Sequence, residues 1–187
     1  MIREFPTISL KTVLPAVQKI IRALPTPSTV ITIDSACSIA GYTLMNNHHM
    51  EFLQSAKHFG LIEYNLQKDI FKISSFAISN FSASLLPNSD AIREAALSPD
   101  IFSELFTYFQ GKLLLPPATI LRASHKYILS DSAKMKLATT FSATMKYLYD
   151  NTPHHKTLQS PDGLVSVCFP SNMTKSQLKK VLTTMLN

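Results

Sequence analysis

The spacing of apolar residues along the first part of the chain predicts two helices. Residues 10–24 carry apolar side chains three and four positions apart, which is the pattern of a helix with one buried face. Ser9 precedes this helix as its expected N-cap. A short helix is expected over residues 33–40, with Thr32 as its cap and Gly41 as its left-handed exit residue.

A third helix and a β-hairpin are expected next. The pattern predicts a helix over residues 44–58, in which Met50, Leu53 and Ala56 face inward and Gly60 closes the C-terminus. Two apolar runs rich in β-formers follow, and the polar loop of residues 65–69 separates them. These runs predict an antiparallel pair of strands over residues 61–64 and 70–73.

The pattern beyond residue 75 is helical and ends in a mixed tail. Pro99 is expected at the first helical position of one helix and Ser130 as the cap of a long one. Pro, His, Ser and Gly over residues 150–163 indicate a linker. The expected elements are helices over 90–96, 99–109, 117–124 and 130–148, a strand over 164–169, and a last helix capped by Thr174.

These elements predict a mostly α-helical fold with a small β-hairpin, divided into three segments. Residues 1–78 hold the first helices and the hairpin, residues 79–150 form a helical second half, and residues 151–187 form a linker with a strand-helix tail. Helices of the last two segments each carry an apolar stripe. Together these stripes offer more apolar surface than a small first domain needs to cover its core. We therefore expect a homodimer that forms through the helical second half.

Composition narrows the classes of function. The formal net charge of +6 favours a polyanionic partner, although residues 1–78 hold only seven Lys and Arg against five Asp and Glu. Two distant cysteines, no apolar run of membrane length and no apolar signal segment predict a cytoplasmic protein. No phosphate loop, dinucleotide fingerprint, nucleophile elbow or zinc-ligand spacing occurs, so we expect neither an enzyme nor a cofactor or metal.

Residues 32–74 place a short helix, a glycine turn, a longer helix and a hairpin in sequence: TIDSACSIAGYTLMNNHHMEFLQSAKHFGLIEYNLQKDIFKIS. With the preceding helix, this order resembles the winged helix-turn-helix DNA-binding superfamily. The junction AKHFGLIEY is similar to the point where a recognition helix passes into the wing. A looser resemblance to uncharacterised bacterial, plasmid and phage winged-helix proteins extends through REAALSPDIFSELF. These resemblances imply a winged helix at the N-terminus, but they bring no established activity.

The resemblance makes the third helix a recognition helix and the hairpin a wing. A helix in the major groove needs short polar side chains near its N-terminal half, and Asn can pair with adenine through two hydrogen bonds. Wing residues would meet phosphate or the minor groove. The expected DNA-binding residues are Thr43, Asn46, Asn47, His48, His49, Gln54, Lys57, Gln67 and Lys68.

Double-stranded DNA is therefore the expected partner, and a dimeric transcriptional regulator of a mobile or accessory gene set is the leading hypothesis. The proposed recognition helix has no arginine and one lysine, so a single domain would bind weakly, and a dimer or a second basic element is implied. A protein-protein adaptor without DNA binding is the alternative, because winged helices also serve as protein-binding modules. The histidine pairs 48–49 and 154–155 are interpreted as solvated surface.

Overall fold

The computed structural model describes most of the chain and divides it into two compact units, Met1–Asn151 and Thr152–Asn187. Residues 1–78 and 79–150, expected as separate segments, therefore share the first unit. The described residues are 4–42, 47–82, 88–152, 155–159 and 166–170.

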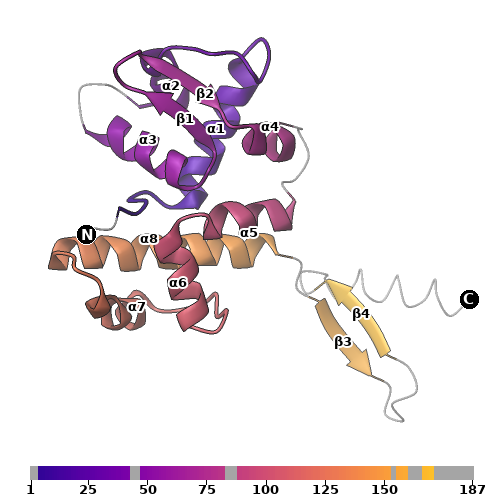
Figure 1. The fold of residues 1–187 in the computed structure, drawn as a ribbon. Coiled ribbons are helices and arrows are strands. Elements are labelled where there is room, and N and C mark those ends of the chain that lie inside the picture. Colours follow the sequence, from indigo (N-terminus) through magenta and orange to yellow (C-terminus); the bar gives the residue numbers. More distant parts are fainter. Residues whose placement is uncertain (1–3, 43–46, 83–87, 153–154, 160–165, 171–187) are drawn as a thin grey trace, which may run out of the picture. The chain divides into compact units, whose positions relative to one another are not determined.

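The first unit is mostly helical and contains a small antiparallel hairpin, which confirms the predicted fold class at this level (Figure 1). Its elements in chain order are α1 Leu10–Ala23, α2 Ile33–Ala40, α3 His48–His58, β1 Ile62–Asn65, β2 Ile70–Ile73, α4 Ser75–Phe81, α5 Ser89–Leu97, α6 Asp100–Tyr108, α7 Pro117–Ala123, the 3-10 helix η1 Ser124–Lys126, and α8 Asp131–Asn151. In the second unit, β3 His155–Gln159 pairs antiparallel with β4 Ser166–Pro170.

Local capping chemistry explains several of these boundaries. The Thr32 hydroxyl accepts a hydrogen bond from the Ser35 N–H at 3.2 Å, and Gly41 ends α2 with a φ of 91°. The Ser130 hydroxyl accepts from the Ala133 N–H at 3.3 Å at the start of α8. Both expected caps are confirmed.

Ser9 behaves differently from the expected cap. It occupies the N-cap position of α1, but its side chain makes no capping hydrogen bond within the described part of the chain. The Leu10 N–H instead donates to the Thr144 hydroxyl of α8 at 3.2 Å. A residue distant in sequence thus accepts one of the N–H groups at the start of α1.

The β1–β2 hairpin is joined to the helices before it. Ile62 pairs with Ile73, and Asn65 pairs with Ile70 at the turn end. Ile31 forms an isolated β-bridge to Phe71, with backbone N–O distances of 3.0 and 2.9 Å, which joins the segment before α2 to β2.

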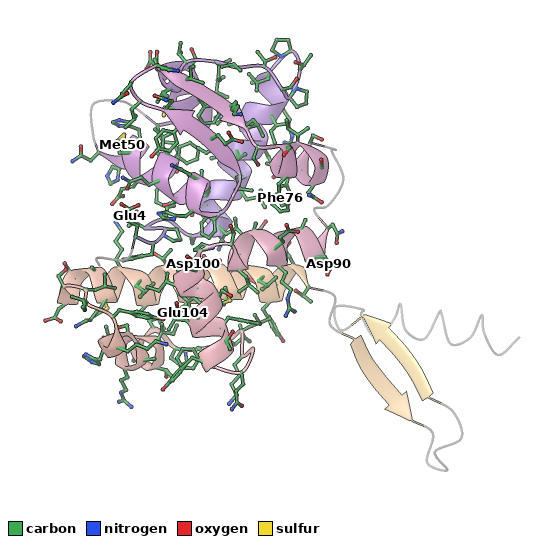
Figure 2. All side chains as sticks on the ribbon, viewed as in Figure 1. Glu4, Met50, Phe76, Asp90, Asp100 and Glu104 are labelled. Atoms are coloured by element: carbon green, nitrogen blue, oxygen red, sulfur yellow. The ribbon has the colours of Figure 1, made fainter. Side chains whose placement is uncertain are left out.

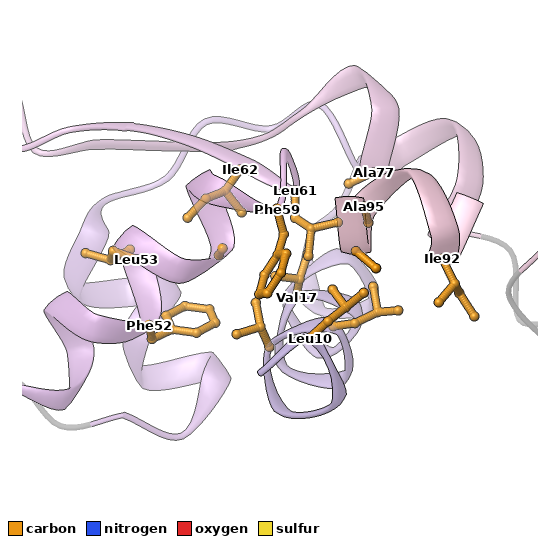
Figure 3. Packing of buried hydrophobic residues seen from close by; sticks show 14 of the residues in the cluster. Leu10, Val17, Phe52, Leu53, Phe59, Leu61, Ile62, Ala77, Ile92 and Ala95 are labelled. Atoms are coloured by element: carbon orange, nitrogen blue, oxygen red, sulfur yellow. The ribbon is translucent and has the colours of Figure 1, made fainter. Parts of the chain in front are cut away.

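One buried core runs through the first unit. Figure 3 shows Leu10 and Val17 of α1 close to Phe59, with Phe52 and Leu53 of α3 at the left of the same view. The ring of Phe59 meets that of Phe102 with centroids 6.0 Å apart, and Phe102 meets Phe141 at 5.2 Å. This chain of edge-to-face contacts continues the core from α3 through α6 into α8. The apolar stripes expected on residues 99–109 and 131–148 are thus largely buried in this core, and Phe102 of α6 meets Phe141 of α8.

Three side-chain hydroxyls also hold the segment before α1. Ser55 of α3, fully buried, accepts the N–H groups of Thr7 and Ile8, each at 3.0 Å. From α8, Thr140 donates to the Thr7 carbonyl at 3.2 Å, and Thr144 accepts the Leu10 N–H. The segment therefore lies between α3 and α8 and is bonded to both, which fixes α3 on the helical second half.

One prediction about a connecting segment was wrong, and one helix was not predicted. Residues 75–81, for which no element was specified, form the helix α4, begun by Ser74, whose hydroxyl accepts the Ala77 N–H at 3.0 Å. Residues 150–163 are not a continuous linker, because α8 extends to Asn151 and β3 occupies residues 155–159. The strand expected over residues 164–169 is found as β4, residues 166–170. The last helix, expected to start after Thr174, lies outside the described residues.

Candidate nucleic-acid interface

The outer face of α3 carries a row of solvent-facing side chains. Asn47, the N-cap of α3, is exposed, as are Gln54 and Lys57. Met50, expected to face inward, is only half-buried and packs against the core from the edge of this row. The spacing of these residues, three, four and three positions, places them on one side of the helix. The opposite side carries Phe52, Leu53 and Ala56, which are fully buried. We call Asn47, Met50, Gln54 and Lys57 the outer face of α3; the label in Figure 2 marks Met50.

The structure supports the exposure predicted for three of the proposed recognition residues. Asn47, His48 and Gln54 are exposed, whereas His49 is half-buried. His48 directs its Nδ1 to the Glu51 carboxylate at 3.4 Å. Thr43 and Asn46, also expected to contact DNA, lie outside the described residues.

Glu51 links α3 to the helical second half. Its carboxylate accepts a hydrogen bond from the Lys136 ammonium of α8 at 2.7 Å. This bond lowers the pKa of Glu51, and partial burial opposes the shift. Sequence spacing gave no signal for this pair, because the two residues are 85 positions apart. The pair leaves the outer face of α3 clear and holds the adjoining face against α8.

The hairpin loop presents the two predicted wing residues to solvent. Gln67 and Lys68 are both exposed. The Asn65 side chain accepts the Lys68 N–H at 3.1 Å and so shapes the loop. Asp69, at a φ of 47°, accepts the Ile33 N–H at 3.0 Å, which ties the loop to the start of α2. Leu66, 54% exposed, adds an apolar side chain to the tip.

Lys57 connects the outer face of α3 to the hairpin. Its ammonium lies 5.5 Å from the centre of the Tyr64 ring on β1. This contact positions the cation without neutralising its charge, because the ring supplies only a quadrupole. Lys57 therefore presents its ammonium group beside the hairpin.

A groove of about 1280 Å³ separates α3 and β1 from α6 and η1. Gln54, Lys57 and Tyr64 line one side, and Asp100, Glu104 and Lys126 are among the residues of the other. Figure 2 labels Glu4 below α3 and Asp100 and Glu104 on α6. Three carboxylates and two ammonium groups thus share the groove, so its interior is not uniformly positive.

His58 adds no positive charge to the groove near neutral pH. It lines the groove, and its Nε2 lies 4.0 Å from the carboxylate of Glu4. Burial lowers the pKa of His58, although the charge of Glu4 acts in the opposite direction. The imidazole is therefore largely neutral at pH 7.

The part of the chain that the structure describes offers few residues that could act in catalysis or bind a metal ion. Cys37 is fully buried in α2, and burial raises the pKa of its thiol to about 11, so it is not an activated nucleophile. No group of three His, Cys, Asp or Glu side chains among the described residues is arranged to hold a metal ion. None of the described helices is both long and apolar enough to cross a membrane.

Comparison with protein-family models, with curated proteins and with solved structures gave no match. A function is therefore inferred from the geometry of the chain itself.

Proposed function

We propose that this protein binds double-stranded DNA as a winged helix-turn-helix regulator, with α3 as the recognition helix and the β1–β2 hairpin as the wing. The observation that carries the proposal is the outer face of α3. It presents Asn47, Gln54 and Lys57 to solvent in one row, on a helix whose opposite side is fixed in the core. A helix of this kind can enter the major groove and place amide groups against base edges.

The roles of the residues follow from their chemistry. Asn47 and Gln54 have the donor-acceptor pair that recognises adenine through two hydrogen bonds. Lys57 on α3 and Lys68 on the wing loop would meet phosphate, which gives affinity without sequence preference. Few cations lie on this surface, so two copies of the chain would supply the phosphate contacts that one copy lacks. We propose a homodimer for that reason.

The proposal is tested by selecting preferred duplexes from a random pool and measuring the affinity of variants by fluorescence anisotropy. Replacing one amide in Asn47→Ala or Gln54→Ala should weaken binding to the selected duplex by about 1–3 kcal/mol, with much less effect on an unrelated duplex. Lys68→Ala should weaken binding to both duplexes alike. Gln18→Ala on α1 is the matched control and should change neither affinity.

A protein-binding adaptor is the second candidate, and the groove beside α3 favours it. Glu4, Asp100 and Glu104 would repel phosphate, whereas a protein partner could supply matching cations. The exposed Leu66 at the wing tip also suits a protein contact. Selection from the random pool distinguishes the two functions, because an adaptor retains no duplex even at low salt.

A further inference from the structure

The stretch between Leu105 and Ser130 contains no acidic residue. It spans the end of α6, the connection that follows, α7 and η1. Its three cations are Lys112, Arg122 and Lys126, and all three are exposed. Positive charge is therefore concentrated in this stretch. In the rest of the helical second half, Asp and Glu balance the Lys and Arg.

Lys126 is held in place by aromatic side chains. Its ammonium lies 4.9 Å from the ring centre of Tyr108 and 5.0 Å from that of Tyr127. Tyr127 is itself buried, with 8% of its surface exposed, and its hydroxyl donates to the Glu104 carboxylate at 3.3 Å. Tyr108 is 60% exposed. The cation is therefore directed by a fixed support and remains open to solvent.

The same groove joins Lys126 to the outer face of α3. Gln54 and Lys57 line one side of the groove, and Tyr108 and Lys126 line the other. A duplex seated on α3 would therefore extend over this groove toward η1. Between the two sides, α6 offers Asp100 and Glu104 and no cation of its own.

We propose that Arg122 and Lys126 form a second contact for the DNA backbone, opposite the recognition helix. This inference rests on the proposed function. The carboxylates of α6 disfavour phosphate over the middle of the groove, so the backbone is met at its two sides, by Lys57 and by Lys126. Arg122, exposed in the last turn of α7, comes four residues before Lys126 and would extend the contact beyond the groove. The pair supplies the basic element that α3 lacks, and it contacts phosphate without reading sequence.

The test measures how binding of the selected duplex depends on salt. Removing one phosphate contact reduces the slope of log K against log salt by about 0.9, so the double variant Arg122→Gln with Lys126→Gln should reduce the slope by about 1.8. The matched control is Lys11→Gln with Lys19→Gln on α1. It removes the same net charge from exposed positions and should leave the slope close to that of the wild type. Urea unfolding of both variants verifies that they fold.

The outcomes separate the two proposals. A wild-type protein that binds no duplex at low salt would overturn the proposed function and this inference with it. Binding with the same slope in wild type and in the Arg122-Lys126 variant would overturn the inference alone. Equal competition by polyglutamate and by duplex DNA would also overturn it, because the surface would then fit an acidic protein as well as a nucleic acid.

Discussion

Substitution of Ser55 by alanine tests how the segment before α1 is fixed. The Ser55 hydroxyl is fully buried and accepts the N–H groups of Thr7 and Ile8, each at 3.0 Å. Ser55→Ala removes the shared acceptor and leaves two donors without this partner. An unpaired buried donor costs about 1–3 kcal/mol.

The expected cost is nearer the lower end of that range for each donor. Thr7 and Ile8 are half-buried, so water can reach their backbone in part. Alanine is also a better helix former than serine, which returns up to about 0.5 kcal/mol. We therefore expect Ser55→Ala to lower the free energy of unfolding by about 2 kcal/mol. That is a large share of the roughly 5–15 kcal/mol that stabilises an ordinary domain.

Urea unfolding followed by circular dichroism measures this change by linear extrapolation. Ser38→Ala, at an exposed position of α2, is the matched control and should change the free energy of unfolding by less than about 0.5 kcal/mol. If Ser55→Ala is no more destabilising than Ser38→Ala, the hydroxyl does not hold this segment. Ser55 lies off the outer face of α3, so the variant should bind DNA normally where it is folded.

Four further predictions concern charge, titration and assembly. The double variant Asp100→Asn with Glu104→Gln should bind the selected duplex more tightly than wild type in anisotropy titrations, because it removes two carboxylates that repel phosphate; weaker binding would contradict this role. His58 has a folded pKa below its unfolded value, so the unfolded state binds more protons and stability falls as the pH drops below about 6.5. In His58→Gln, the urea midpoints of unfolding at about pH 7.5 and about pH 5.5 should differ less than in wild type. An unchanged difference would contradict this contribution of His58 to the pH dependence. In a Cys168→Ser background, Cys37 should resist iodoacetamide at about pH 8 until the protein is unfolded, because its pKa is about 11 and its side chain is buried. Fast labelling of the folded protein would contradict the burial of this thiol. Light scattering should give about twice the chain mass of 20.8 kDa, whereas a mass near 20.8 kDa would exclude the proposed dimer.

Local sequence signals were sufficient where the chain forms its structure from neighbouring residues. The apolar stripe of α1, the Thr32 cap and Gly41 placed the first two helices almost to the residue. The exposure of Asn47 and Gln54 followed from their polarity opposite Leu53 and Ala56.

The features that the sequence did not reveal depend on partners far along the chain. Thr140 and Thr144 are polar residues on the buried side of α8, and only their bonds to the segment before α1 explain that burial. The Glu51–Lys136 pair and the groove beside α3 likewise arise from tertiary packing. The helix α4 was missed because its seven residues include two Phe and one Ile, which are weak helix formers.

The groove also changes how the candidate site is understood. Sequence patterns placed the DNA contacts on α3 and the hairpin alone. The structure adds Asp100 and Glu104 across from Gln54 and Lys57, a combination that no local pattern predicts. Spacing reveals which side of a helix is polar, but not which charges a distant helix places beside it.

The proposed function is tested most directly by a map of backbone amide shifts as the selected duplex is added to isotope-labelled protein. If α3 recognises DNA, the largest changes fall on Asn47, on residues 48–57 of α3 and on residues 66–68 of the hairpin loop, with a second group near Arg122 and Lys126. Changes confined to other surfaces, or none at low salt, would contradict recognition of DNA by α3.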